Sequence, residues 1–147
     1  MMKRTFSYPV TLTPDRVDGG YVVTFADFPE LATQGETKTE ALQQAVDALE
    51  EALVGRIKRG DEIPSPSRAK EKLPAVSPSA FISSKVALYV AMRDSKLNRM
   101  TLAERLGCDE KEVRRLLDPK HPSKLPRLSA ALAVLGKRLI VNLEDVG

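Results

Sequence analysis

Basic side chains gather in one stretch of this sequence, and their chemistry suits phosphate and guanine. Lys111, Arg114 and Arg115 have the spacing of one helix face, and Lys120 and Lys124 follow closely. Arginine can donate two hydrogen bonds to the edge of guanine, and lysine neutralises phosphate as a point charge. We therefore expect contact with DNA through the following residues: Thr101, Asp109, Lys111, Arg114, Arg115, Lys120, His121 and Lys124.

The elements that would position these side chains form a helix-turn-helix pattern over residues 99–118. Thr101 can cap a first helix, in which the small residue Ala103 lets a second helix approach. Gly107 can take the left-handed conformation that ends the first helix, and Asp109 can cap the second. The inward positions are apolar: Leu102, Ala103, Leu106, Val113, Leu116 and Leu117. A plain helical hairpin, in which these residues serve packing alone, is the alternative interpretation.

The charge of the chain changes sign between its halves. Residues 1–62 contain 7 basic and 11 acidic side chains, a net charge of −4, whereas residues 63–147 contain 16 and 9, a net charge of +7. A basic half attracts phosphate, and an acidic half is repelled by nucleic acid and suits a basic protein partner. Ordinary solvated surface charge is the alternative explanation.

The length of 147 residues allows one domain or two small ones, and the cysteine content fits a reducing compartment. Two cores within 147 residues would each be only marginally stable alone, so oligomerisation would help both. The single cysteine, Cys108, excludes an internal disulfide. The sequence has no recognisable signal peptide or apolar run of membrane-spanning length, so we expect a soluble, cytoplasmic protein without membrane contact.

The N-terminal half predicts a small antiparallel sheet and one packed helix. The expected elements are strands over residues 6–13, 21–25 and 31–34 and a helix over residues 37–60. Alternating apolar and polar residues indicate the strands, and Pro9 favours an edge position for the first of them. Thr37 and Glu40 fit a capping box at the start of the helix, and Gly60 can end it.

Proline and serine residues between positions 63 and 80 indicate a linker, in which residues 73–76 can add a short edge strand to the first sheet. Helical patterns follow over residues 82–95 and 125–135, and residues 139–143 are β-prone. The predicted fold class is α+β. Its expected parts are an αβ domain over residues 1–62, the linker over 63–80 and an all-α helix-turn-helix domain over 81–147.

An ordered set of motifs resembles the HicB antitoxins of bacterial HicA–HicB toxin–antitoxin systems. The motifs are Tyr8–Pro14, Gly19–Tyr21, Asp27–Glu30, Thr33–Thr37 and Glu40–Ala41. The second half resembles the HicB branch that carries a helix-turn-helix instead of a ribbon-helix-helix. The resemblance implies a degraded ribonuclease-H-like domain that binds and blocks HicA, a small basic messenger-RNA ribonuclease. It also implies that the C-terminal domain dimerises and represses the operon.

We expect no enzymatic activity, because ribonuclease-H chemistry needs carboxylates around metal ions, normally with one on the first strand. Residues 6–12 contain no Asp or Glu. His121 is the only histidine and has no cysteine or carboxylate neighbours at ligand spacing. The sequence therefore predicts no catalytic residue, metal site or cofactor.

The acidic first domain would instead steer a basic toxin, and those of its aromatic side chains that do not belong to the core would anchor it. The candidate toxin-binding residues are Tyr8, Tyr21, Phe25, Asp27, Phe28, Glu30 and Glu36. The second domain would form a homodimer or a higher oligomer on operator DNA, and residues 139–143 could pair across the two-fold axis or close the domain's own core. The alternative function is a stand-alone helix-turn-helix regulator with an N-terminal ligand-sensing domain.

Overall fold

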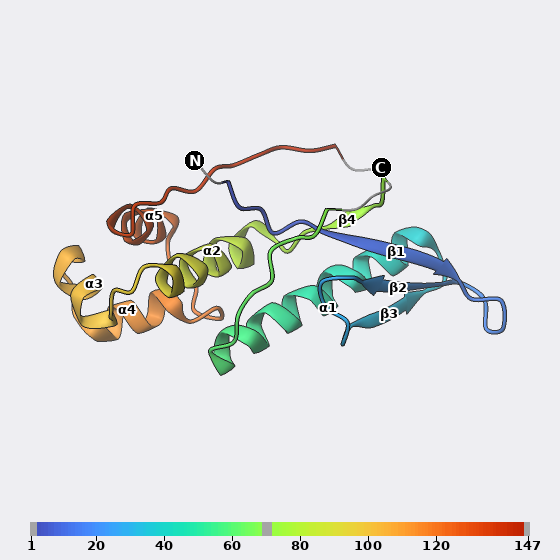
Figure 1. Ribbon diagram of the computed structural model, residues 1–147, viewed down its shortest axis with the longest axis horizontal. Coiled ribbons are helices and arrows are strands. Elements are labelled where there is room, and N and C mark those ends of the chain that lie inside the picture. Colours follow the sequence, from blue (N-terminus) through green and yellow to red (C-terminus); the bar gives the residue numbers. More distant parts are fainter. Residues whose placement is uncertain (1–2, 69–71, 146–147) are drawn as a thin grey trace. The chain divides into compact units, whose positions relative to one another are not determined.

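The computed structural model describes residues 3–68 and 72–145, and the chain divides into two compact units, Met1–Ser83 and Ser84–Gly147 (Figure 1). The elements are β1 (Tyr8–Pro14), β2 (Tyr21–Phe25), β3 (Ala32–Gly35), α1 (Lys38–Arg59), β4 (Ala75–Val76), α2 (Ala80–Asp94), α3 (Arg99–Leu106), α4 (Glu110–Leu117) and α5 (Leu125–Val134). The predicted α+β class is confirmed at the level of one small antiparallel sheet and these helices.

The sheet of the first unit has the strand order β3-β2-β1-β4, and all neighbouring strands are antiparallel. β1 is therefore an interior strand, and the edge position predicted from Pro9 is wrong. The N–H of Val10 donates to the carbonyl oxygen of Pro74 at 2.9 Å, on the β4 side. The nitrogen of Pro9 consequently faces the other side, where pairing with β2 begins only at Val10. The proline thus removes no donor that a partner strand needs.

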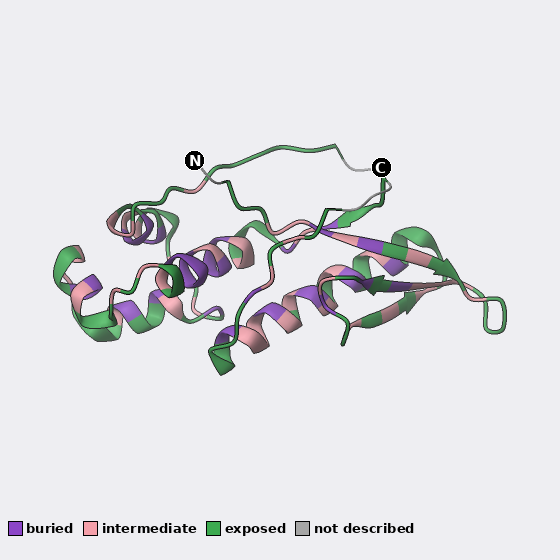
Figure 2. Ribbon diagram, in the orientation of Figure 1, coloured by how far each residue is buried: buried purple, intermediate pink, exposed green. Residues whose placement is uncertain are grey.

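Helix α1 packs an apolar stripe against the sheet, and Figure 2 shows buried positions recurring along it. The buried residues are Ala41, Ala45, Leu49, Leu53 and Ile57. The side chain of Thr37 accepts from the N–H of Glu40 at 3.1 Å, and Gly60 is left-handed with φ 74°, so both predicted helix ends are confirmed. A Cβ on Gly35, at the end of β3, would lie 2.4 Å from the backbone nitrogen of Ala41. The close approach of β3 to α1 therefore requires glycine there.

The described part of the segment 63–80, predicted as a linker, packs on the first unit. Ile63 is buried, and the hydroxyl of Tyr8 donates to the carbonyl oxygen of Pro64 at 2.7 Å. β4 lies within the range predicted for a short edge strand, and it pairs Val76 with Tyr8. These contacts cover the edge of β1 that does not pair with β2.

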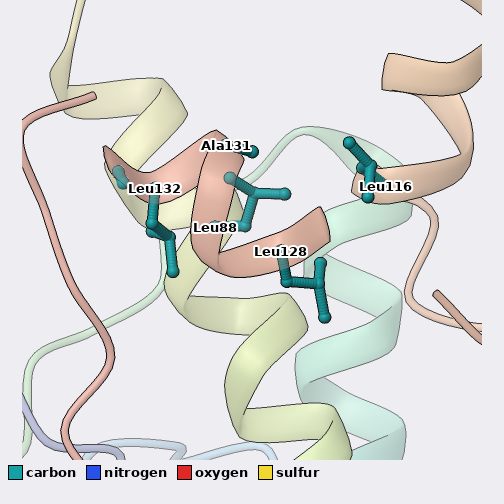
Figure 3. Packing of buried hydrophobic residues seen from close by; sticks show 6 residues of the cluster. Leu88, Leu116, Leu128, Ala131 and Leu132 are labelled. Carbon is teal, nitrogen blue, oxygen red and sulfur yellow. The ribbon is translucent and has the colours of Figure 1, made fainter. Parts of the chain in front are cut away.

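The core of the second unit is built where its helices meet. Figure 3 shows Leu88 of α2, Leu116 of α4 and the α5 residues Leu128, Ala131 and Leu132 packed together. A second cluster joins α3 to α4 and consists of Leu102, Ala103 and Val113. The helices predicted over 82–95 and 125–135 correspond to α2 and α5, with ends that differ by at most two residues.

Residues 139–143, predicted to be β-prone, form no strand in the single chain. Leu139 packs against the core of the second unit, whereas Val141 and Leu143 are 89% and 100% exposed. Among the helices of the described residues, none is long and apolar enough to span a bilayer.

Candidate functional site

The hairpin of α3 and α4 begins at an N-cap that the sequence reasoning misplaced. Asn98 has an extended backbone, and its side-chain oxygen accepts from the N–H of Thr101 at 2.8 Å. Thr101, predicted as the cap, therefore lies inside the first turn of α3. The physical reason is that asparagine is at least as good a cap as threonine, so the helix begins earlier.

The turn between the two helices follows the prediction. Gly107 ends α3 with φ 68°, and its conformation is the left-handed one. The side chain of Asp109 accepts from the N–H of Glu112 at 2.8 Å and thereby caps α4. Both local expectations are confirmed, and together they fix the direction in which α4 leaves the turn.

The exposed face of α4 carries the predicted arginines. Lys111, Arg114 and Arg115 are exposed, whereas Val113 and Leu116 are 0% and 1% exposed. This confirms the predicted division of α4 into an inward apolar face and an outward face that is mixed in charge but rich in arginine. The exposed face also has negative charge, because Glu110 shares it. The other carboxylate of the helix, Glu112, lies 3.7 Å from the guanidinium of Arg127 on α5.

The loop after α4 carries the remaining predicted DNA-binding residues. Lys120 and Lys124 are exposed, and His121 is half-buried. The N–H of His121 donates to the carbonyl oxygen of Asp118 at 3.1 Å, and its Nδ1 lies 3.2 Å from the hydroxyl of Ser123. The loop is therefore held by its own hydrogen bonds directly beyond the C-terminal end of α4.

Lys85 of α2 is a functional candidate that the sequence reasoning missed. Its side chain is 0% exposed, and its ammonium nitrogen contacts the end of α4 and the following loop. A signal was present, because Lys85 precedes Leu88 and Tyr89 by three and four positions and therefore shares their buried face. A lysine on such a face needs partners for its charge.

Three of the aromatic residues predicted to bind a toxin belong to the core instead. Tyr8, Phe25 and Phe28 are 0%, 3% and 0% exposed. The ring of Phe28 lies edge-on to both others, at centroid distances of 4.9 Å and 6.1 Å. Burial raises the pKa of Tyr8 to about 12. These rings therefore hold the first unit together and are not available as surface anchors, which corrects the expectation.

Two of the predicted acidic residues have partners within the first unit. Asp27 accepts from the backbone N–H of Ser67 at 3.1 Å, and Glu30 forms an ion pair with Arg56 at 2.7 Å. The hydrogen bond from Arg56 holds the pKa of Glu30 below its usual range. Both carboxylates therefore help to attach neighbouring segments of the first unit. Less of their negative charge is then available to a basic protein partner.

The other two candidates, Tyr21 and Glu36, lie close together at one end of the sheet. Tyr21 pairs with Gly35, the residue before Glu36, and it follows the turn of the β1–β2 hairpin directly. Tyr21 is half-buried and Glu36 is exposed. Val17, 91% exposed, lies in the same turn between the acidic residues Asp15 and Asp18. We call this set, Asp15, Val17, Asp18, Tyr21 and Glu36, the hairpin-end surface. The basic residues Arg16 and Lys38 border it.

Comparison with known proteins decides the family. A family profile described as "HicB_like antitoxin of bacterial toxin-antitoxin system" matches residues 7–87. This chain belongs to the HicB-like antitoxin family. The match confirms the resemblance drawn from the motifs between Tyr8 and Ala41.

Curated relatives agree with this HicB-like assignment over almost the whole chain. It is similar to Antitoxin HicB 1 of Photorhabdus laumondii, with 37% identity over 141 residues that cover 96% of this chain and 89% of the relative. It is also similar to Antitoxin HicB of Escherichia coli K12, with 39% identity over 132 residues that cover 90% and 95%. Antitoxin HicB of Pseudomonas fluorescens is 31% identical over 144 residues, covering 97% and 99%. As a HicB-like antitoxin, the protein is a non-enzymatic component of a toxin–antitoxin system.

Proposed function

We propose that this HicB-like antitoxin neutralises a HicA-like ribonuclease toxin through its first unit and represses its own operon through its second. Family membership carries the first part, because the matched region, residues 7–87, contains the whole described sheet and α1. The exposed arginines on a capped α4 support the second part, in which the α3–α4 hairpin acts as a helix-turn-helix. Both activities place the protein in the cytoplasm. The first unit would be a degraded ribonuclease-H-like domain, as the family resemblance implies, because β1 contains no Asp or Glu and so lacks the carboxylate that this chemistry normally places on the first strand.

The hairpin-end surface is the part of the first unit best suited to a basic toxin. It combines the exposed carboxylates of Asp18 and Glu36 with Val17 and Tyr21, which offer apolar area beside them, while the half-buried Asp15 accepts from backbone N–H groups of its own turn. Opposite charge steers the encounter, while a partly exposed aromatic side chain supplies much of the energy of a protein interface. The buried rings of Tyr8, Phe25 and Phe28 leave Tyr21 as the candidate aromatic contact among the predicted ones.

We expect the double substitution Tyr21→Ala/Glu36→Lys to abolish neutralisation of the toxin in cells. It removes an aromatic contact and turns an attractive charge into a repulsive one, and hot-spot truncations cost about 2 kcal/mol or more. The measurement is growth and messenger-RNA decay after co-expression of the cognate toxin with the full chain. Glu51→Lys, a matched charge reversal at an exposed position of α1, serves as the control and should still protect. Full protection by the double variant would refute this contact surface.

Repression of an operator requires two copies of the second unit, because one helix-turn-helix reads few bases. A two-fold dimer would place two α4 helices about 34–36 Å apart on a palindrome. Residues 139–143 are the proposed pairing segment, since Leu139 is attached to the core while the apolar side chains of Val141 and Leu143 are exposed to solvent in the single chain. Their β-prone composition suits pairing with the same segment of a second copy.

We expect Val141→Asp/Leu143→Asp to convert the dimer into a monomer, because like charges would face each other across the two-fold axis. Sedimentation at micromolar concentration measures the assembly state, and an operator titration measures the accompanying loss of affinity. Ile140 is not substituted. The control is Glu144→Gln, a neighbouring substitution that introduces no negative charge. A variant that still sediments as a dimer would show that the dimer interface lies outside residues 139–143.

A further inference from the structure

The ammonium group of Lys85 lies at the C-terminal end of α4. Its Nζ donates to the carbonyl oxygens of Arg115 and Leu116 at 3.0 Å and 2.9 Å, and to the hydroxyl of Ser123 at 2.8 Å. The last four carbonyl groups of a helix have no partner within it. Lys85 therefore satisfies two of these carbonyls on α4, where a positive charge also interacts favourably with the helix dipole.

The same contacts attach the loop after α4 to the helix. Ser123 accepts from Lys85, and its hydroxyl also lies 3.4 Å from the carbonyl oxygen of Arg115. His121 reaches the same hydroxyl through Nδ1 at 3.2 Å. One buried nitrogen thus joins α2, the last turn of α4 and the loop that carries Lys120 and Lys124.

The oxygen acceptors around Nζ show which protonation state of Lys85 fits the site. Three oxygen acceptors lie within 3.0 Å of Nζ and can take all three N–H donors of an ammonium group, whereas a neutral amine has only two hydrogens and a lone pair that would face an oxygen. Burial of a charge is costly unless such partners are present. The hydrogen-bond geometry therefore favours the charged form, whereas burial opposes it.

We propose that Lys85, in its ammonium form, is a positioning residue that holds the end of α4 and the loop 118–124 in the arrangement that binds operator DNA. The inference rests on the proposed DNA-binding function of the second unit. Lys85 is completely buried and touches no DNA itself. Its effect passes through the backbone of Arg115, whose side chain is exposed on the proposed reading face, and through Ser123.

The ionisation of Lys85 gives this role a pH dependence. Burial lowers the pKa of Lys85 to about 8, and the carboxylate of Asp118 acts in the opposite direction. The elements around it carry these other titratable or charged groups: Arg93 and Asp94 on α2, Glu110, Lys111, Glu112, Arg114 and Arg115 on α4, Lys120, His121 and Lys124 in the loop, and Arg127 on α5, which pairs with Glu112. At pH 7 the ammonium prevails, and above about pH 8 the group loses its charge together with one of its hydrogen-bond donors.

The test compares the full-length parent chain with Lys85→Met, using a DNA duplex that covers the region upstream of the operon. At pH 7 we expect Lys85→Met to bind this duplex about tenfold more weakly, the size expected from loss of hydrogen bonds with a charged donor. The salt dependence should stay the same, because no phosphate contact is removed. The parent should lose affinity between pH 7 and pH 9, whereas Lys85→Met should be weak throughout that range.

Leu88→Ala is the matched control, because it also weakens the core of the second unit on α2 but removes none of the atoms that hydrogen-bond with Lys85. All chains are compared at a temperature at which circular dichroism shows them folded. Leu88→Ala should keep the parental pH profile. If Lys85→Met does not fold, Ser123→Ala replaces it, and this change should weaken binding at pH 7 and reduce the pH dependence. Parental affinity and an unchanged pH profile in the folded variant would overturn the proposal.

Hydrogen exchange tests the positioning role of Lys85 without DNA, and therefore separately from the proposed DNA-binding function. The backbone N–H groups of His121 and Ser123 are hydrogen-bonded within the loop. We expect them to exchange faster in Lys85→Met without any DNA present. A parent chain that fails to bind the duplex would refute the proposed DNA-binding function, whereas unchanged exchange at these two amides would refute the positioning role of Lys85.

Discussion

The Arg114→Ala/Arg115→Ala double variant is expected to lose about 2–6 kcal/mol of operator binding, since each bidentate arginine–guanine contact contributes about 1–3 kcal/mol. Both side chains are exposed on α4, and the neighbouring Val113 and Leu116 fix the orientation of that face by burying the opposite one. The loss should be largest for the true operator and small for an unrelated duplex. Titration of both duplexes at one salt concentration gives the difference.

The control for this result is a change that affects phosphate binding only. Lys120→Ala or Lys124→Ala, each exposed in the loop after α4, should weaken binding to all duplexes alike. Each should also reduce the salt slope by about 0.9, because one phosphate fewer is neutralised by the protein. Operator binding that survives the double arginine change undiminished would show that another surface reads the bases.

Phe28→Ala is expected to destabilise the first unit by about 3–5 kcal/mol, the usual cost of removing a fully buried aromatic side chain. Phe28 is 0% exposed, contacts the rings of Tyr8 and Phe25, and lies 5.0 Å below the guanidinium of Arg56. A unit of this size has little stability to lose, so we expect it to unfold and neutralisation of the toxin to fail.

Urea unfolding followed by circular dichroism measures this effect directly. Val17→Ala is the control, because Val17 is 91% exposed and its truncation should change the free energy of unfolding by less than about 0.5 kcal/mol. A Phe28→Ala variant with the stability of the parent would mean that the aromatic cluster does not hold the first unit together.

Local signals in the sequence predicted the elements well, because each depends on only a few neighbouring residues. The capping pair of Thr37 and Glu40 located the start of α1, and glycine with a left-handed backbone located the ends of α1 and α3 at Gly60 and Gly107. The inward and outward faces of α4 also followed from spacing alone, so the proposed reading residues Arg114 and Arg115 could be identified before the fold was known.

Long-range contacts explain what the sequence could not reveal. Pro9 suggests an edge strand, because the strand that pairs with β1 on its second side, β4, comes only after α1 in the sequence. Aromatic residues near carboxylates look like surface anchors, yet Tyr8 and Phe28 are buried by contacts with segments distant in the chain. Lys85 acquires its role only because α4 and Ser123 approach it from 30 or more positions away.

The pairing of β1 with β4 has a consequence for the order in which the protein matures on the ribosome. The sheet that begins at Tyr8 is complete only once Val76 has been synthesised. The residues that follow the first unit, 84–147, then take roughly 3–13 s more at about 5–20 residues per second. A nascent chain can therefore form the unit proposed to bind the toxin before it can form the unit proposed to bind DNA. With this division of labour, translation alone would give protection against the toxin a head start over repression.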